Sequence, residues 1–212
     1  MSSGKHFHNV LCLSEAKGMD IIMKIGVLAL QGAFAEHEKV LEQLGAECIE
    51  LRQARDLAEP YDALVLPGGE STVQGKLLKE LGMFDIMKSQ IENGMPVLAT
   101  CAGAILLAET IDGQIKGLPE QYFGTIPMCI RRNAYGRQLG SFHTEAPVAG
   151  IGTVPMTFIR APYIASVGDG VEVLAVVEER IVGVKHKNQM AFSFHPELDP
   201  DVRIHKAFLE MI

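Results

Sequence analysis

The fold of this chain is decided by the stretch PVLATCAGAILLA at residues 96–108. Its apolar run Val97–Thr100 predicts a buried strand of an α/β sheet, and the alanine- and leucine-rich residues 102–109 predict a helix. Cys101 stands between the two, with small neighbours that permit a sharp turn. A strand that turns directly into a helix presents its hinge residue at the carboxyl edge of the sheet. The stretch therefore predicts a strand–cysteine–helix nucleophile elbow.

The predicted helix after Cys101 gives this cysteine a distinct chemical environment. Unpaired N–H groups and a partial positive charge at a helix N-terminus favour a thiolate over a thiol and stabilise a developing oxyanion. A cysteine in an apolar run is, however, more often a buried core residue. Motifs elsewhere in the chain have to decide between these two interpretations.

Length and composition limit the class of protein. A chain of 212 residues with 48% hydrophobic and 21% charged residues suits one α/β domain with a sizeable core. The net charge of −7 argues against nucleic acid or an anionic membrane as the main partner. The sequence contains neither a spanning apolar run nor a secretory signal pattern. Four scattered cysteines without a C-x-x-C motif predict neither disulfides nor zinc, and therefore a reducing, cytoplasmic location.

Hydrophobic periodicity divides the chain into two parts. Residues 1–22 show no periodic pattern and are interpreted as an N-terminal extension, disordered or upstream of the native start. Residues 23–212 read as a single domain in which strands alternate with helices. The predicted strands are 24–30, 47–52, 62–66, 97–100, 123–130, 171–177, 181–186 and 190–194. The predicted helices are 34–44, 73–81, 83–92, 102–109 and 203–212. This order predicts a three-layer α/β fold with a largely parallel sheet.

Two further segments carry polar chemistry. Pro67-Gly68-Gly69-Glu70-Ser71-Thr72 directly follows a strand, and its glycines allow close approach of a ligand while Ser71 or Thr72 caps the next helix. The segment lacks the Gly-Lys-Ser/Thr ending of a phosphate loop. Basic residues stand out at 131–138 and at Arg160, where they form either solvated loops or clamps for a carboxylate.

The triplet His195-Pro196-Glu197 offers a partner for Cys101. Proline disfavours the helical region for His195, so we expect an extended segment in which His195 and Glu197 point to the same side. Glu197 could then fix the tautomer of the imidazole and stabilise its protonated form. His195 could in turn accept the proton of the Cys101 thiol.

These motifs together resemble the class I glutamine amidotransferases, the family with a Cys-His-Glu triad. The resemblance is carried by Thr-Cys-Ala-Gly at 100–103, Pro-Gly-Gly-Glu-Ser-Thr at 67–72 and Ser-Phe-His-Pro-Glu at 193–197. Within that family, three further segments are similar to the glutaminase subunits of pyridoxal 5′-phosphate synthases. They are Leu-Gln-Gly at 30–32, Arg-Asn-Ala-Tyr-Gly-Arg-Gln at 132–138 and Phe-Ile-Arg-Ala-Pro at 158–162. The resemblance extends from about Met23 to the C-terminus.

The resemblance implies a role for each matching residue and a flavodoxin-like sheet. Cys101 would be the nucleophile, His195 the general base and acid, and Glu197 its orienting carboxylate. The backbone N–H groups of Gly69 and Ala102 would form the oxyanion hole. The implied glutamine-binding residues are Gly69, Glu70, Ser71, Arg132, Ile159 and Arg160.

The implied reaction is hydrolysis of L-glutamine to L-glutamate and ammonia through a cysteinyl thioester. It requires no metal and no cofactor. The ammonia would pass to a partner synthase subunit for pyridoxal 5′-phosphate (vitamin B6) biosynthesis. The segment Gly140–His143 departs from the family pattern, in which Asp at the first and Glu at the last position are expected. His143 is interpreted as a surface residue.

Three alternatives stay open at this stage. The chain could be a glutaminase that supplies a histidine, purine or aromatic biosynthetic synthase, although residues 132–138 and 158–162 speak against this. It could be a cysteine hydrolase or chaperone of the related elbow-cysteine superfamily, whose cysteine commonly pairs with a glutamate near the first strand. It could also be a catalytically silent regulatory subunit, which the intact triad disfavours.

Overall fold

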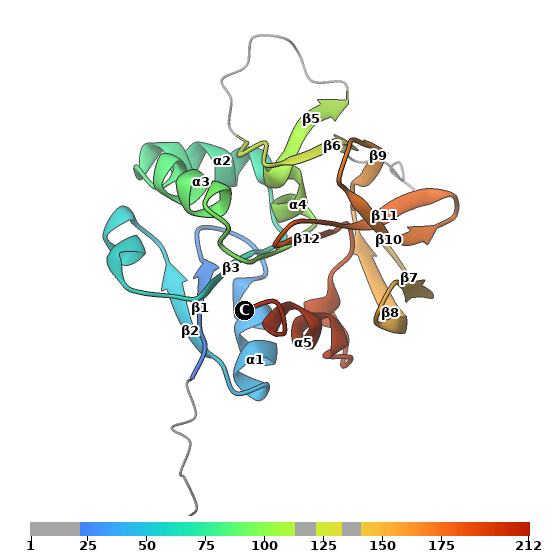
Figure 1. The fold of residues 1–212 in the computed structure, drawn as a ribbon, viewed down its shortest axis with the longest axis horizontal. Helices are drawn as coiled ribbons and strands as arrows, with labels where there is room; N and C mark the ends of the chain where they lie inside the picture. Colours follow the sequence, from blue (N-terminus) through green and yellow to red (C-terminus); the bar gives the residue numbers. More distant parts are fainter. Residues whose placement is uncertain (1–21, 113–121, 133–140) are drawn as a thin grey trace, which may run out of the picture.

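The structure, a computed structural model, describes residues 22–112, 122–132 and 141–212. A ten-stranded sheet forms its centre (Figure 1). One half of this sheet is parallel, in the order β2-β1-β3-β4-β12. These strands are β1 (Lys24–Leu28), β2 (Glu47–Leu51), β3 (Ala63–Leu66), β4 (Val97–Thr100) and β12 (Gln189–Phe192). Their carboxyl ends meet at one edge, which is where ligands bind in open α/β sheets.

The other half of the sheet is mostly antiparallel. It continues from β12 in the order β11-β9-β6-β5, and β10 pairs with β11 as a hairpin. Only β5 and β6 run parallel to each other in this half. The strands are β5 (Ala108–Asp112), β6 (Ile126–Arg131), β9 (Tyr163–Val167), β10 (Glu172–Val177) and β11 (Arg180–His186). The expected α/β fold with a flavodoxin-like parallel core is confirmed.

Two layers of helices cover the sheet (Figure 1). One face carries α1 (Phe34–Gln43) and α5 (Arg203–Leu209). The other face carries α2 (Ser71–Glu80), α3 (Phe84–Glu92) and α4 (Ala102–Leu107). Two short 3₁₀ turns, η1 (Ala54–Ala58) and η2 (Pro196–Leu198), complete the described helices. The three layers match the architecture expected from the alternation of strands and helices.

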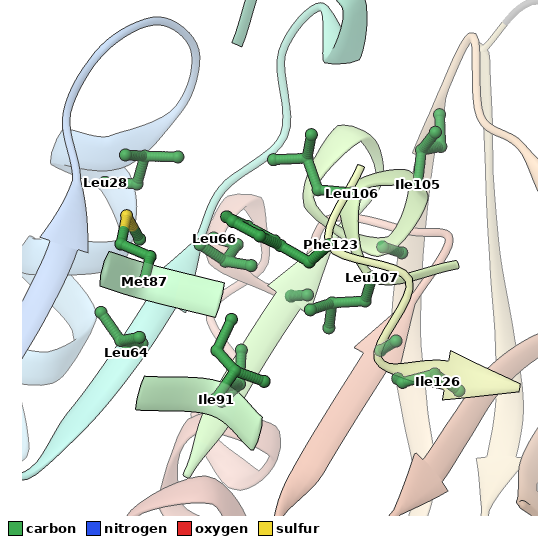
Figure 2. Close-up of a cluster of buried hydrophobic side chains, with 14 of the residues drawn as sticks. Leu28, Leu64, Leu66, Met87, Ile91, Ile105, Leu106, Leu107, Phe123 and Ile126 are labelled. Atoms are coloured by element: carbon green, nitrogen blue, oxygen red, sulfur yellow. The ribbon is translucent and has the colours of Figure 1, made fainter. Parts of the chain in front are cut away.

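Each layer of helices packs on its own hydrophobic core because strand side chains alternate between the two faces. In β3, Leu64 and Leu66 point into the core under α3 and α4, which Figure 2 shows together with Met87 and Phe123. Ala63 and Val65 of the same strand join the opposite core under α1 and α5. Because β3 is buried on both faces, it reads as a continuous apolar run rather than an alternating one.

Two expectations about secondary structure are wrong. The helix expected at 102–109 ends at Leu107, because residue 108 already begins β5. The hairpin of β7 (Ser141–Val148) and β8 (Gly152–Ile159) was not expected at all, nor was β9. Both hairpin strands contain a proline, and a proline in a sequence argues against a strand. The two strands form a separate two-stranded sheet, in which each strand has a free edge that can accommodate its proline.

Candidate active site

Cys101 occupies a strained elbow between β4 and α4. Its backbone has φ 48° and ψ −103°, a conformation that L-residues rarely adopt, and its N–H donates to the Phe192 carbonyl over 2.8 Å. Gly103 allows α4 to pack against β3, since a Cβ there would lie 1.9 Å from the Leu66 carbonyl oxygen. Ala102 is the first residue of α4. The predicted elbow is therefore present, and it holds Cys101 at the carboxyl edge of the sheet.

His195 and Glu197 follow β12 and lie beside the elbow. The imidazole Nδ1 of His195 is 2.6 Å from Oε1 of Glu197, and both side chains are buried. The backbone N–H of His195 donates to the Thr157 carbonyl of β8 over 2.8 Å, so the unexpected hairpin helps to place the imidazole. His195 is non-helical, as expected, but Glu197 lies in the turn η2 rather than in an extended segment. The predicted contact between His195 and Glu197 is therefore made, but the backbone conformation differs from the expected one.

The three side chains form a charge-coupled group. Burial lowers the pKa of His195, but hydrogen bonds with Cys101 and Glu197 and their negative charges outweigh burial and raise it to about 10. Burial raises the pKa of Glu197, but electrostatic interactions with His37 and His195 and the hydrogen bond from His195 bring it below its ordinary value. The arrangement therefore favours a protonated His195 that Glu197 holds in place beside the sulfur of Cys101.

The segment after β1 and the segment after β3 pack tightly against each other at this edge. The Ala33 N–H donates to the Gly68 carbonyl over 3.2 Å, and the Gln31 side-chain oxygen accepts from the Glu70 N–H over 2.7 Å. A Cβ on Gly68 would lie 2.3 Å from Cε1 of His195. Only glycine allows the backbone of residue 68 to approach the imidazole so closely.

A cavity of about 250 Å³ opens over Cys101. Eight of the ten residues predicted for the site line it, and the other two, Ala102 and Glu197, are buried directly behind. The lining residues are Gln31, Gly32, Ala33, Gly68, Gly69, Glu70, Ser71, Cys101, Ile105, Arg132, Ile159, Arg160, Pro162, His195 and Leu198. Residues that are far apart in the sequence are thus brought together around one thiol.

The walls of this cavity carry groups of both charges. Nη2 of Arg132 is 2.8 Å from Oε1 of Glu70, so a cation and an anion lie side by side at the rim. Arg160 follows β8 with a positive φ of 44°. The hydroxyl of Ser71 is buried without a hydrogen-bond partner among the described residues; Ser71 is the first residue of α2, and neither it nor Thr72 caps that helix as expected.

Sequence reasoning missed four polar residues around the triad. Gln31 belongs to the segment 30–32 that carries the resemblance and is expected at the same sheet edge as the glycine loop, but the hydrogen bond by which its side chain fixes the loop at residue 70 was missed. His37, Thr100 and His205 form a buried cluster behind Glu197. The only sequence signal for His37 and His205 was a polar residue on an otherwise apolar helix face, which is too common to be diagnostic.

The remaining expectations have mixed outcomes. His143 lies in β7 with an exposed side chain, in agreement with a surface role, so the segment 141–143 is a strand rather than a loop. Two expectations fall on residues that the structure does not describe. Residues 1–21 contain nearly all of the N-terminal extension, and residues 133–140 contain most of the basic segment 131–138. The cysteines at positions 48, 101 and 129 are free, and no helix in the described ranges is long and apolar enough to span a membrane.

Comparison with known proteins defines the class. Residues 27–212 match the SNO glutamine amidotransferase family. A curated relative from Desulfitobacterium hafniense (strain Y51), named pyridoxal 5′-phosphate synthase subunit PdxT, is 59% identical over 90% of this chain and 94% of its own length. A relative of the same name from Streptococcus pneumoniae serotype 2 (strain D39) is 55% identical over 89% of this chain and 97% of its own. The chain belongs to the SNO glutamine amidotransferase family.

Solved structures agree with this assignment. A crystal structure described as a glutamine amidotransferase superposes with a TM-score of 0.82 and 44% identity, covering 88% of this chain and 97% of that one. A structure described as PurLQS from Thermotoga maritima gives a TM-score of 0.65 at 16% identity, over 89% of this chain and 98% of that one. The second likeness shows the fold alone.

Proposed function

We propose that this chain is the glutaminase subunit of a pyridoxal 5′-phosphate synthase. It hydrolyses L-glutamine to L-glutamate and ammonia in the cytoplasm and delivers the ammonia to a synthase subunit. The observation that carries the proposal is the hydrogen-bonded pair of His195 and Glu197 beside Cys101, at the base of a cavity lined by the predicted substrate residues. The names and high identity of the curated relatives support the choice of synthase.

The proposed reaction begins with attack of the Cys101 thiolate on the side-chain amide carbon of glutamine. The resulting oxyanion is stabilised by the N–H groups of Gly69 and Ala102. His195 then gives its proton to the departing nitrogen, and ammonia leaves behind a thioester. His195 next accepts a proton from a water molecule, which attacks the thioester and releases glutamate. Glu197 holds the imidazole in the same orientation for both proton transfers.

The charged rim suits the two ends of the amino acid. Arg132 and Arg160 can bind the α-carboxylate of glutamine, because a guanidinium group can donate two hydrogen bonds to a carboxylate. Glu70 can bind the α-ammonium group, and Ser71 lines the same cavity. Ile159, at the cavity wall, offers apolar contact to the methylene groups. The site therefore fits a short zwitterionic amino acid with an amide at its far end.

The alternatives fit the site less well. In the elbow-cysteine hydrolases and chaperones, a glutamate near the first strand is expected beside the cysteine. Here the segment after β1 contributes Gln31, Gly32 and Ala33 to the cavity wall, and the partner of the cysteine is His195. A silent subunit would have no reason to keep a strained elbow and a buried histidine–carboxylate pair.

We expect docking of the synthase subunit to raise kcat/KM for glutamine by about 10²–10³, the usual value of one oxyanion donor. The glycine-rich loop at 68–69 can rest with its peptide in a non-productive orientation, and Gln31 at the same edge offers a partner a means to bias it. The measurement is glutamate release from glutamine, alone and with saturating synthase subunit. Equal values in a demonstrated complex would refute the activation, whereas no glutamate in either condition would refute the function.

We also expect a chain that starts at Met23 to hydrolyse glutamine at the full rate. The carbonyl of Met23 accepts the Glu47 N–H over 2.9 Å, and Met23 packs against the core under α1, which supports a catalytic unit that begins at this residue. The free energy of unfolding should fall by less than about 2 kcal/mol, the contribution of one well-packed core side chain. A larger loss, measured by urea denaturation against the full chain, would place the domain boundary further upstream.

A further inference from the structure

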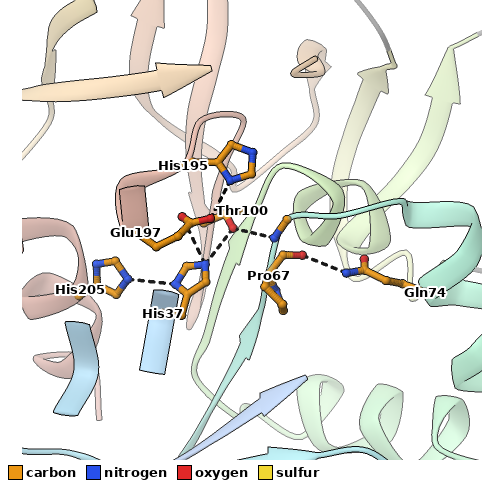
Figure 3. A network of polar contacts seen from close by, with 8 residues as sticks. His37, Pro67, Gln74, Thr100, His195, Glu197 and His205 are labelled. Carbon is orange, nitrogen blue, oxygen red and sulfur yellow. Dashed lines mark hydrogen bonds and ion pairs between the residues drawn. The ribbon is translucent and has the colours of Figure 1, made fainter. Parts of the chain in front are cut away.

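A string of buried polar side chains extends from Glu197 away from the cavity (Figure 3). Oε2 of Glu197 lies 3.3 Å from Nε2 of His37, and both side chains are completely buried. Nδ1 of His37 lies 3.0 Å from Nε2 of His205, which is also fully buried. These two histidines come from α1 and α5, the two helices on the face of the sheet opposite α4.

His37 also contacts the strand that carries the nucleophile. Its Nε2 lies 3.1 Å from the hydroxyl of Thr100, the residue before Cys101. The same hydroxyl accepts the N–H of Gly68 over 3.1 Å. One ring nitrogen of His37 is therefore shared between the orienting carboxylate and the residue that anchors the glycine loop.

Geometry and charge fix the proton positions along this string. Burial lowers the pKa of His37, and burial together with His37 lowers the pKa of His205 to about 3, so both rings are neutral. A neutral ring has one N–H, and the Glu197 carboxylate requires that of His37 to be on Nε2. Nδ1 of His37 then accepts from Nε2–H of His205. The bare Nδ1 of His205 is the end of the string, and it has no partner among the described residues.

We propose that His37 and His205 are positioning residues of the glutaminase site, an inference that rests on the proposed function. The protonated Nε2 of His37 lies 3.3 Å from Oε2 of Glu197, an oxygen that has no hydrogen bond among the described residues, and this electrostatic contact helps to hold the carboxylate ionised and aimed at His195. Through Thr100 the same imidazole ties the carboxylate to the loop of Gly68. His205 acts one step further out by selecting the tautomer of His37.

The alternative is that these histidines only fill space between two helices. A filler would not need both ring nitrogens of His37 in polar contact, and burying two imidazoles costs free energy that burying leucine or phenylalanine would not. The polar contacts point toward Glu197 and not toward solvent. The contacts therefore lead from His205 through His37 to Glu197, which is a member of the triad.

A matched pair of amide substitutions separates the two roles of His37. The amide nitrogen of glutamine falls near Nε2 of a histidine, and that of asparagine falls near Nδ1. We therefore expect His37→Gln to keep kcat for glutamine within about 3-fold, and His37→Asn to lower it by about 10²-fold, the usual effect of a 1 Å misplacement. KM should change little, because neither ring nitrogen lines the substrate cavity. His186, which bonds the Gly170 carbonyl outside this string, provides the control His186→Gln with unchanged kcat.

The pH profile distinguishes positioning from packing. The groups that face Glu197 are His195 and His37. The groups that act on His37 are Glu197, His195, Glu36, His205 and Thr100. Removing the Nε2–H of His37 from beside Oε2 of Glu197 makes the ionised carboxylate less stable, so the acid limb of kcat should move to higher pH in His37→Asn. A variant that is merely less well packed would have a lower kcat at every pH, and the acid limb of its profile would stay at the same pH. An unshifted limb together with reduced kcat would overturn the proposal.

Two readouts do not need glutamine turnover. Alkylation of Cys101 by iodoacetamide, followed by mass spectrometry of its peptide, should show the same upward shift of the acid limb in His37→Asn. Cys48 is an internal reference, because burial and the nearby Glu38 and Glu42 raise its pKa to about 12 and leave it unreactive. Nitrogen-15 NMR of histidine-labelled wild-type protein should show His37 neutral with its proton on Nε2.

The outcomes keep the two proposals apart. If the wild-type chain with its synthase does not hydrolyse glutamine but the NMR and alkylation results hold, the function is wrong and the positioning role of His37 survives. If glutamine is hydrolysed but His37 is an imidazolium, or carries its proton on Nδ1, the positioning role is wrong. Equal kcat values for His37→Gln, His37→Asn and wild type would also overturn it.

Discussion

Cys101→Ala abolishes glutamine hydrolysis and leaves the fold intact. Alanine lacks the sulfur that attacks the amide, and without a nucleophile only the slow attack of water remains. The side chain is small, so it causes no clash in the elbow, although residue 101 keeps its unfavourable φ of 48° with either side chain. We therefore expect no detectable glutamate above background with saturating synthase subunit, and a thermal midpoint close to that of wild type.

The other two members of the triad set a graded comparison. His195→Asn should be nearly as damaging as Cys101→Ala, since it removes the group that moves both protons. Glu197→Gln should be less damaging, because it removes an orienting charge while keeping a side chain of the same size. The kcat of each variant is measured with matched circular dichroism spectra. Wild-type release of ammonia by Cys101→Ala would show that the nucleophile has been assigned wrongly.

Sequence patterns were sufficient for the half of the molecule where local signals agree with the fold. The apolar runs of β1, β3 and β4 read as buried parallel strands because both of their faces are covered. Gly103 and Cys101 marked the elbow because few residues tolerate a turn that packs a helix against the neighbouring strand. The parts of the site that belong to such turns were therefore predictable.

The rest depends on contacts that no local pattern records. The hairpin of β7 and β8 escaped detection because each strand contains a proline and packs one face only. His37 and His205 lie 168 positions apart in the chain and become neighbours only when α1 and α5 cover the same face of the sheet. Glu197 contacts His195 from a 3₁₀ turn and not from an extended segment, because more than one backbone conformation of the short loop after β12 allows the same hydrogen bond.

Gly32→Ala lowers kcat/KM for glutamine by about 10³-fold or more. Residue 32 has φ +108°, and a Cβ there would lie 1.7 Å from the Gly68 carbonyl oxygen, which is backbone and cannot move aside on its own. The loop of residues 68 and 69 must shift instead. That shift removes the Gly69 oxyanion donor, worth about 10²–10³. It also changes the contact between Gly68 and His195, so the total loss exceeds that of one donor.

Gly45→Ala is the matched control for this effect. Residue 45 has a similar positive φ of 88°, but a Cβ there would meet nothing within 4 Å. Both variants therefore carry the same kind of backbone strain, about 1 kcal/mol, and only Gly32→Ala displaces the loop. We expect a wild-type kcat/KM for Gly45→Ala with saturating synthase subunit, and a lower thermal midpoint for Gly32→Ala than for Gly45→Ala because only the former adds a steric clash. If Gly32→Ala also kept wild-type kcat/KM, the loop at 68–69 would not supply the oxyanion donor, and Ala102 would have to do so without it.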